Sequence, residues 1–581
     1  MIKRYLTLFA ASIALTACST TEKPLSAVIP PQILAPTLTA SPEERGLVSA
    51  ADPRAAEAGA QMLRMGGSAT DAAIATMLAL TVVEPQSSGI GGGGFFVHAL
   101  ANGTVTTIDG RETAPAAAGP DWFLGPNSEP LSYQDAVLTG LSVGVPGNVR
   151  LAEMAHEQHG TLAWAALVEP AYKLASGGFE ITPRFHEYLG KSKNRGGASA
   201  EGRALFYDQT GEPKPVGTVV RNPELAVTLR KLADEGPDSF YDGSFASDLA
   251  AHVRKATPRP AGMSAEDVAS YAAKSRDAVC GVYRDYRICG MGPPSSGATT
   301  VLAILKQLEP LDLTAIGPAS PTSWHLFAES QRLAYADRER YLADSDFVPV
   351  PVDWLVQSDY LATRAALISA TSTIEIVEPG VAPETALAPP DGNEAPENGT
   401  SHFVTVDRDG NAVSYTSTIE GPFGSGLMFG GFYLNNELTD FSFAPEIDGR
   451  KVANRVEGGK RPRSSMAPTV VYGPDGQMIY VLGAAGGGTI PTQVAKTLIG
   501  LIDFDLTLAE ALALPQLYSP GDTVVIEEGT MLEAMVDDFK ALGHGNVMAR
   551  SPPLKTNAAQ WTADGWIGAG DPRSEGVSIS E

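Results

Sequence analysis

Apolar residues recur at helical spacing along most of the chain before residue 378. An N-cap followed by proline, Asp52-Pro53, opens an Ala-, Leu- and Met-rich stretch that ends at Gly66-Gly67. A second stretch, from Ser68 to about Val83, is apolar on nearly every side, which is typical of a buried helix. The same spacing predicts further helical segments over 134–175, 222–234, 247–254, 298–308 and 321–342.

After residue 400 the apolar residues recur at every second position, which is the spacing of a β-strand. The run from His402 to Asp407 alternates, Asp409-Gly410 is a strong hairpin turn, and Val413 to Ile419 forms a second β run. Further strands are predicted over 431–435, 469–472 and 478–482, followed by a helix over 492–502. Strand-rich layers flanked by helices indicate a layered α/β or α+β sandwich.

A segment that cannot bury much apolar surface separates these two parts. Residues 378–399, EPGVAPETALAPPDGNEAPENG, hold five prolines and five acids and almost no large apolar group. Such a composition does not order itself, so we expect a boundary here.

The first residues have the pattern of a targeting segment. Lys3 and Arg4 precede an apolar stretch that is too short to span a bilayer, which predicts a signal peptide over 1–17. The run Leu15-Thr16-Ala17-Cys18 resembles the bacterial lipobox, so we expect Cys18 to be lipidated and residues 18–44, rich in Pro, Ser, Thr and Ala, to act as a flexible tether. This predicts a periplasmic protein anchored to the outer membrane. The alternative is an ordinary secretory signal that happens to contain a cysteine.

Net charge and cysteine content limit the binding partners and the covalent links that the protein is expected to have. A net charge of −25 without a basic patch argues against a nucleic-acid or anionic-lipid surface, so membrane contact is expected only through the lipid anchor. Cys280 and Cys289 face each other if Arg284-Asp285 forms a two-residue turn, and the periplasm permits disulfides. Two buried free thiols fit the pattern equally well.

The familiar catalytic motifs are missing. Gly89 to Gly94 matches GxGxxG, but a helix precedes it and a strand follows, the reverse of a dinucleotide-binding turn; a close backbone passage is the better reading. The sequence has no HExxH or Walker A motif, and its eight histidines lack metal spacing. The chemistry expected is one that needs no histidine and no metal.

Thr400 offers such a chemistry. It follows the acidic segment directly and precedes a predicted strand. If the bond after Gly399 is cut, the α-amine of Thr400, with a pKa of about 7.7 to 8.0, can serve as base for the hydroxyl of the same residue. Alone the signal is weak, because threonine before a strand is ordinary β-propensity.

The surrounding motifs strengthen this hypothesis. Nearly all of the chain from Gly46 to Glu575 resembles the γ-glutamyltransferase (glutathione hydrolase) family of N-terminal-nucleophile enzymes. The matching runs, in the family's order, are DPRAAEAGAQMLRMGGSATDAA, VVEPQSSGIGGGGFF, DGRETAP, PPSSG, GTSHFVTVDRDGNAVSYTSTIEGPFGSG, LNNELTDFS, KRPRSSMAPT, GAAGGG and DPRS. The resemblance implies an αββα four-layer sandwich made from one precursor that cuts itself. It also implies a large subunit, 45–399, paired with a small catalytic subunit, 400–581, and no metal or organic cofactor.

The resemblance assigns the catalytic groups. Thr400 takes the nucleophile position, with cleavage between Gly399 and Thr400. Thr418 corresponds to the threonine that bonds to the nucleophile's amine and assists processing. Gly486 and Gly487 correspond to the oxyanion hole, and glycines let two backbone N–H groups point at one spot.

It also assigns the substrate-binding groups. Arg111 corresponds to the arginine on the α-carboxylate of a γ-glutamyl group, a role suited to a guanidinium fork. Asp440 corresponds to the acid on the α-ammonium, with Glu420 and Glu437 at two further positions near it. Ser464 and Ser465 correspond to the serine pair on the same carboxylate.

Two features depart from the family pattern. The segment 443–459 is shorter than the lid loop of many members and has no tyrosine, so we expect an open pocket. Ala484-Ala485 replaces a common Ser-Pro before the two glycines.

The activity implied is hydrolysis of glutathione and related γ-glutamyl compounds, or transfer of the γ-glutamyl group to an amino acid or peptide. One alternative is an amidase of the same fold, acting on glutaryl or cephalosporin side chains or on γ-glutamyl polymers. Another is a non-catalytic lipoprotein that keeps the fold as a binding module.

Overall fold

The computed structural model describes residues 46–383, 399–552 and 554–581. The predicted signal peptide, the lipidation site Cys18, the tether and most of the acidic segment lie outside the described residues. Within the described ranges, no helix combines the length and the apolar character needed to cross a membrane.

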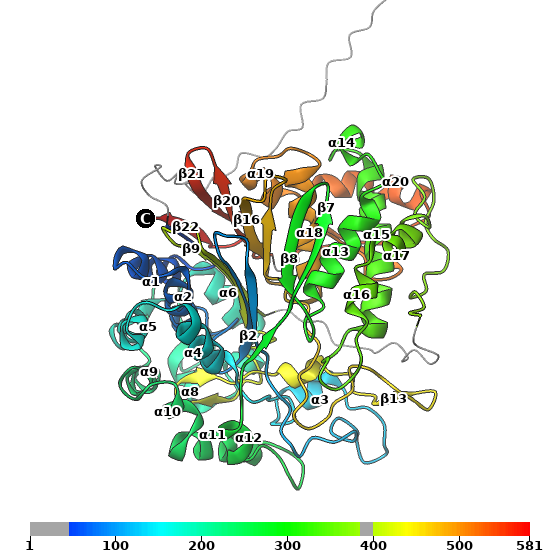
Figure 1. The fold of residues 1–581 in the computed structure, drawn as a ribbon. Coiled ribbons are helices and arrows are strands. Elements are labelled where there is room, and N and C mark those ends of the chain that lie inside the picture. Colours follow the sequence, from blue (N-terminus) through cyan, green and yellow to red (C-terminus); the bar gives the residue numbers. More distant parts are fainter. Residues whose placement is uncertain (1–45, 384–398, 553) are drawn as a thin grey trace, which may run out of the picture. The chain divides into compact units, whose positions relative to one another are not determined.

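Two antiparallel sheets form the centre of the molecule (Figure 1). The seven-stranded sheet has the order β22 (Val577–Ser580), β1 (Leu47–Ala50), β9 (Ser401–Val406), β10 (Ala412–Thr418), β2 (Gly93–Ala99), β3 (Val105–Gly110), β6 (Lys274–Arg276). The six-stranded sheet has the order β21 (Gly565–Gly570), β20 (Asn557–Thr562), β16 (Met478–Gly483), β15 (Thr469–Tyr472), β8 (Tyr286–Met291), β7 (Ala278–Tyr283). Each sheet combines strands from before and after residue 400.

The side-chain alternation of the strands separates two cores. On β2, Phe95 and Val97 belong to the same core as Val470 and Leu482 of the other sheet, which places them between the sheets. Phe96, between them in the sequence, belongs to a second core with the helices on the outer face. The period of two read from the sequence therefore reports which layer each side chain enters.

Helices cover the outer faces of both sheets. Helices α1 (Pro53–Arg64), α2 (Ala69–Val83), α4 (Asn148–His159) and α5 (Trp164–Gly177) pack over the seven-stranded sheet. Helices α13 (Gly297–Leu308), α15 (Pro321–Tyr341) and α18 (Ile490–Ile502) pack over the six-stranded sheet (Figure 1). The order helix, sheet, sheet, helix is the predicted αββα sandwich.

Local signals fixed most helix boundaries. The side chain of Asp52 caps α1 by accepting a hydrogen bond from the amide of Arg54 at 2.8 Å. Ser68 and Asp71 form a capping box at the start of α2, whose residues are all buried. The predictions for α9 (Pro223–Glu235) and α11 (Gly243–Lys255) are also confirmed.

Two predicted elements were wrong in extent. The stretch 134–175 is three helices, α3 (Tyr133–Val137), α4 and α5, because glycines and Pro146 between the first two, and Gly160 between the last two, interrupt the helical pattern. The strand expected over 431–435 is only β12 (Phe432–Tyr433), paired with β11 (Met428–Phe429) in a small separate hairpin.

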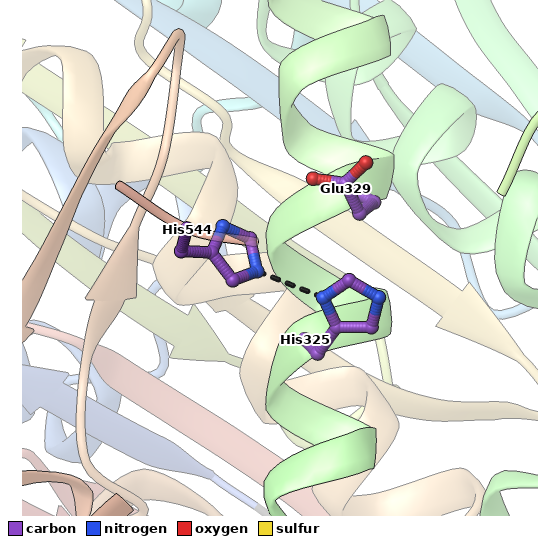
Figure 2. A group of neighbouring side chains, drawn as sticks. All are labelled: His325, Glu329 and His544. Carbon is purple, nitrogen blue, oxygen red and sulfur yellow. Dashed lines mark hydrogen bonds between the residues drawn. The ribbon is translucent and has the colours of Figure 1, made fainter. Parts of the chain in front are cut away.

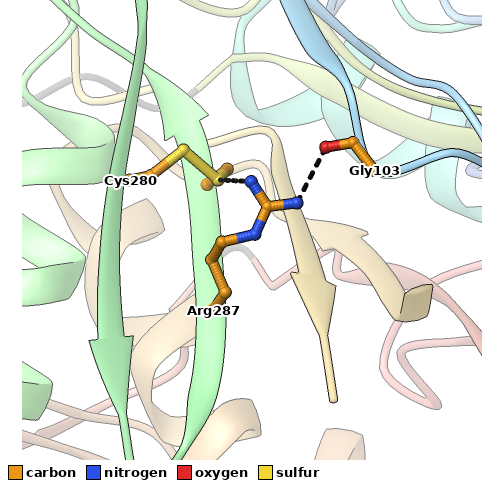
Figure 3. Close-up of a disulfide and its surroundings, with 4 residues drawn as sticks. Gly103, Cys280 and Arg287 are labelled. Atoms are coloured by element: carbon orange, nitrogen blue, oxygen red, sulfur yellow. Dashed lines mark hydrogen bonds between the residues drawn. A yellow bond between two sulfur atoms is a disulfide. The ribbon is translucent and has the colours of Figure 1, made fainter. Parts of the chain in front are cut away.

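The β7–β8 hairpin has the predicted register. Arg284 and Asp285 have φ values of 49° and 70°, as a two-residue turn requires, and Cys280 pairs with Cys289. The two cysteines form a disulfide, so the free-thiol alternative is wrong (Figure 3). Arg287 lies beside it, donating to the carbonyl of Gly103 at 2.8 Å (Figure 3).

Candidate active site

Thr400 lies immediately before β9 and is buried, with 5% of its surface exposed. Its Oγ1 contacts the carbonyl oxygen of Gly399 and lies 3.1 Å from the Oγ1 of Thr418. Thr418 also donates to the Gly399 carbonyl at 3.0 Å. The carbonyl that precedes the candidate nucleophile is therefore held between two hydroxyl groups.

The β9–β10 hairpin creates this pairing. Asp407 accepts hydrogen bonds from the amides of Asp409 and Asn411 at 3.0 and 2.9 Å, which closes the turn predicted at Asp409-Gly410. The register then pairs Ser401 with Ser417, so Thr418 stands opposite Thr400. A hairpin turn readable in the sequence thus sets the distance between the two threonines.

The glycine run 89–94 is a close backbone passage and not a nucleotide loop. A Cβ added at Gly92 would overlap the carbonyl oxygen of Thr418, and one at Gly91 would overlap that of Tyr433. The interpretation of these glycines as a place where backbones meet is confirmed.

Gly486 and Gly487 follow β16 and precede α18. Their φ values are 133° and 61°, a conformation that glycine adopts without steric cost. No described contact joins them directly to Thr400. The connection runs through Lys555, whose carbonyl accepts from the amide of Ala485 at 3.1 Å and whose ammonium donates to the carbonyl of Thr400 at 3.1 Å.

Arg111 lies at the end of β3 and is 1% exposed. Its guanidinium is paired with the carboxylates of Glu437 and Asp440, which belong to a 3₁₀ turn, η1 (Glu437–Asp440). It also donates to the backbone carbonyls of Pro462 and Arg463 at 3.2 and 2.8 Å. The structure therefore brings together one cation and two acids that the sequence separates by more than 300 residues.

Glu420 connects this charged cluster with the threonines. Glu420 is 2% exposed and has a φ of 72°, and its carboxylate accepts from the side-chain amide of Asn436. Its backbone N–H donates to the Oγ1 of Thr418 at 2.8 Å, and its carbonyl accepts from the amide of Gly399 at 2.7 Å. Tyr133 lies 3.4 Å from the Glu420 carboxylate, and burial together with that negative charge raises the pKa of Tyr133.

The serine pair follows directly after the carbonyls that Arg111 binds. Ser464 Oγ accepts from the amide of Met466 at 3.2 Å, and the backbone carbonyl of Ser464 accepts from Ser296 at 2.8 Å. Ser465 Oγ accepts from Arg338 at 2.7 Å. Both serines are buried, and Ser464 directly follows Arg463, whose carbonyl accepts from Arg111.

The segment 443–459 turns back on itself next to this cluster. It forms the short hairpin β13 (Glu446–Ile447) and β14 (Arg450–Lys451). Asn454 fixes its base, donating to the carbonyl of Asp440 at 2.6 Å and accepting from the amide of Arg463 at 3.0 Å. The hairpin tip is exposed.

Sequence reasoning missed Lys555 and Glu84. Lys555 donates to Glu84 Oε2 at 2.9 Å, and Ser401 donates to the same oxygen at 2.6 Å. Glu84 stands within a run quoted for the family resemblance, but no role was given to it. The available signal was a single lysine, Lys555, two residues before the uncharged strand β20, because such a charge needs a partner if it is buried.

The fold brings together a histidine cluster that the spacing of histidines in the sequence did not indicate. His325 and Glu329 stand one turn apart on α15, and His544 follows α20 (Val536–Ala541) (Figure 2). His325 Nδ1 lies 2.8 Å from His544 Nε2, and its Nε2 lies 2.8 Å from the carbonyl of Ser369. Burial lowers the pKa of His544 to about 4, so this imidazole is neutral at physiological pH.

The Glu329 carboxylate of this cluster also accepts hydrogen bonds from protein groups. Glu329 accepts from the amide of Ile374 at 2.6 Å and from Arg332 at 2.8 Å. Protein groups therefore satisfy these side chains, and the cluster links segments from before and after residue 400.

The comparisons with known proteins agree with this architecture. The model of the family described as gamma-glutamyltranspeptidase matches residues 55–580. The chain belongs to this family. It is 35% identical over 546 residues to the glutathione hydrolase proenzyme of Escherichia coli (strain K12), with 91% of each chain covered. It is 32% identical over 548 residues to the acylase ACY 1 proenzyme of Pseudomonas sp. (strain SE83), covering 92% of this chain and 93% of that relative.

Among solved structures, the cephalosporin acylase from Bacillus halodurans superposes with a TM-score of 0.81 at 24% identity, covering 96% of this chain and 98% of that one. At this identity the likeness shows the fold alone, and the fold is that of the gamma-glutamyltranspeptidase family.

Proposed function

We propose that the protein is a self-processing γ-glutamyl hydrolase and transpeptidase with Thr400 as its nucleophile. The observation that carries this proposal is the contact of Thr400 Oγ1 with the Gly399 carbonyl, which also accepts a hydrogen bond from Thr418 at 3.0 Å. A hydroxyl in contact with the carbonyl of its own preceding peptide has the proximity that intramolecular attack requires.

Self-cleavage would proceed by an acyl shift. Thr400 Oγ1 attacks the carbonyl carbon of Gly399, an ester bond forms, the Gly399–Thr400 amide bond breaks, and the hydroxyl proton ends on the Thr400 nitrogen. Water then hydrolyses the ester, leaving a carboxylate on Gly399 and a free amine on Thr400. The products would be the subunits 45–399 and 400–581, and they would stay together because both sheets combine strands from the two.

The processed site supports acyl transfer. The Thr400 amine takes the hydroxyl proton as Oγ1 attacks the γ-amide carbon of the substrate, and the same proton then passes to the leaving amine. Gly486 and Gly487 would supply N–H donors for the oxyanion, a contribution of about 3 kcal/mol for each donor. Water or an amino acid then takes the γ-glutamyl group from the ester.

The charged cluster fits the free end of a γ-glutamyl group. Arg111 would receive the α-carboxylate, together with Ser464 and Ser465. Asp440, with Glu437, would receive the α-ammonium. Since the ammonium and the carboxylate of a zwitterion cancel, the substrate would add no net charge to this buried site, where two acids already face Arg111.

We propose export and a lipid anchor from the N-terminal sequence alone. Residues 1–17 would be removed as a signal peptide, Cys18 would be lipidated, and residues 18–44 would tether the enzyme to the outer membrane. Mass spectrometry of the mature N-terminus checks this, because an unlipidated N-terminus would contradict it.

The test of the activity uses wild-type protein, Thr400→Ala and Thr400→Ser. Intact mass and N-terminal sequencing of the wild type should give two subunits, one beginning at Thr400, with activity on a γ-glutamyl-anilide. Thr400→Ala should be uncut and inactive, and Thr400→Ser should be cut. A wild-type chain that stays whole would refute the proposal.

A second candidate function is favoured by the similarity to the acylase ACY 1 proenzyme. A glutaryl group differs from a γ-glutamyl group only by lacking the α-ammonium, so the acids beside Arg111 should discriminate between them. We expect glutaryl-anilide to be cut at least about 100-fold more slowly, because the site's acids lose their partner. Equal rates would favour the acylase function.

The short segment 443–459 adds a hypothesis about substrate size. If its hairpin leaves the pocket open, γ-glutamyl polymers should be cut as well as glutathione. Failure to bind or cut such polymers, with glutathione hydrolysed normally, would contradict it.

A further inference from the structure

The ammonium of Lys555 is buried beside the peptide bond proposed to be cut. The residue is 3% exposed, and its Nζ donates to Glu84 Oε2 and Ser87 Oγ at 2.9 Å and to the carbonyl oxygen of Thr400 at 3.1 Å. An ammonium has three N–H donors, so these three acceptors use all of them. One of the three belongs to the proposed nucleophile.

The charged groups around Lys555 come from three helices. Glu84 follows α2, Arg184 lies on α6 (Pro183–Lys191), and Asp52 precedes α1. Burial lowers the pKa of Lys555, while the carboxylate of Glu84 opposes that shift. Glu84 also accepts from Ser401, so one carboxylate holds both Lys555 and the residue after Thr400.

Lys555 also contacts the proposed oxyanion loop. Its backbone carbonyl accepts from the amide of Ala485 at 3.1 Å, directly before Gly486. The backbone of Lys555 thus contacts the loop that leads into Gly486, and its side chain contacts the proposed nucleophile Thr400.

We propose that Lys555 is a positioning residue, whose ammonium fixes the carbonyl of Thr400 and whose backbone fixes the Gly486 loop once Gly399 has separated. The inference rests on the proposed function. Cleavage removes the covalent bond to Gly399, so Thr400 becomes a chain end that would fray unless its backbone is held. The bond from Lys555 to the Thr400 carbonyl survives that cleavage.

The position of the ammonium has an electrostatic consequence. Within one residue the nitrogen and the carbonyl oxygen are separated by at most about 3.6 Å, so the new amine would lie within about 7 Å of Nζ. A positive charge at that distance disfavours protonation, which lowers the pKa of the amine and favours its base form. Removing the charge should therefore move the acid limb of the pH profile to higher pH.

The experiment compares Lys555→Met with a matched control, Lys496→Met. Lys496 is another buried lysine that donates to backbone carbonyls, those of Leu512 and Leu514, and it has no described contact with Thr400. Rates are measured per mole of cleaved enzyme with a γ-glutamyl-anilide, across pH.

Lys555→Met should lower kcat by about 10- to 100-fold, the cost of a misplaced reacting group, while KM changes less than about threefold. Its acid limb in kcat/KM should move upward in pH. Lys496→Met should change neither quantity. An unshifted limb together with an unchanged kcat in Lys555→Met would overturn the proposal.

Glu84→Gln keeps the proposal testable if Lys555→Met does not fold. This change removes the carboxylate that anchors the Lys555 ammonium, so kcat should fall while KM changes less than about threefold, as in Lys555→Met. An unchanged kcat in Glu84→Gln would contradict the proposal. An uncut wild-type chain would overturn the proposed function as well, whereas a cut and active wild type with unresponsive variants would overturn this inference alone.

Discussion

The hydroxyl of Thr418 lies 3.1 Å from the hydroxyl of Thr400 and donates to the Gly399 carbonyl at 3.0 Å. The two threonines stand opposite each other at the open end of one hairpin, so the pairing register of β9 and β10 fixes their separation. Their relationship gives Thr418 a direct part in self-cleavage, because its proton can stabilise the negative charge that develops on the carbonyl oxygen.

Thr418→Ala should therefore slow self-cleavage by about 100- to 1000-fold, the cost of removing one oxyanion donor. Thr418→Ser keeps the hydroxyl and should cleave within a few-fold of the wild-type rate. A time course of subunit formation by intact mass checks both. Equal cleavage in the two variants would show that the hydroxyl is not required.

Arg111→Gln should affect both substrate binding and stability. Loss of the guanidinium should raise KM for γ-glutamyl substrates by about 10- to 100-fold, because a charge-assisted bond contributes about 1.5–3 kcal/mol. Glu437 and Asp440 would lose their buried counter-ion, at a cost of about 3–5 kcal/mol in the free energy of unfolding.

A triple variant separates these two effects. Adding Glu437→Gln and Asp440→Asn to Arg111→Gln should recover most of the lost stability and leave KM high, as seen by chemical unfolding and steady-state kinetics. Recovery of KM along with stability would contradict a role for Arg111 in recognition.

Glu112 should make stability depend on pH. Burial raises the pKa of this carboxyl from 4.5 to about 7, opposed by Arg111 and Arg461, and Glu437 lies beside it. The protonated form is favoured in the folded state, so its stabilising effect is fully present below pH 4.5 and is lost as pH rises to about 7.

Glu112→Gln removes that titration. As pH rises from 4.5 to 8, the unfolding free energy of the wild type should fall relative to that of the variant by on the order of 3 kcal/mol. Urea unfolding at several pH values checks this, with the exposed Asp564→Asn as the charge-matched control. Parallel pH profiles for wild type and Glu112→Gln would refute it.

The disulfide between Cys280 and Cys289 should contribute stability without affecting catalysis. The cysteines are nine positions apart, and closing so short a loop stabilises by at most about 3 kcal/mol on chain-entropy grounds. The double variant Cys280→Ala and Cys289→Ala should lower Tm and leave kcat unchanged. Reductant should lower the Tm of the wild type and have no effect on the variant; a response in the variant would contradict this assignment.

The sequence contained the local structure in readable form. Asp52-Pro53 and the Ser68–Asp71 box began their helices as expected, since caps act within a few residues. Asp409-Gly410 closed its hairpin as expected, and Arg284-Asp285 closed its hairpin in the expected register. The periodic pattern failed where glycines and a proline divided the region 134–175 into three helices, and where the strand expected over 431–435 shortened to Phe432–Tyr433.

The family and its fold were also predictable, because many motifs stand in one order along the chain. The gamma-glutamyltranspeptidase family is confirmed over residues 55–580. The roles of individual site residues stay predictions, which the variants above test.

Only the tertiary structure decided which distant groups share one environment. The salt bridges of Arg111 with Glu437 and Asp440, and the contact between Lys555 and the Thr400 carbonyl, join segments that no local rule relates. The hydrophobic periodicity predicts that a side chain is buried, but it does not predict which residues surround that side chain. A buried charge is tolerated only next to its partner, and that partner is set by the packing of two sheets drawn from both halves of the chain.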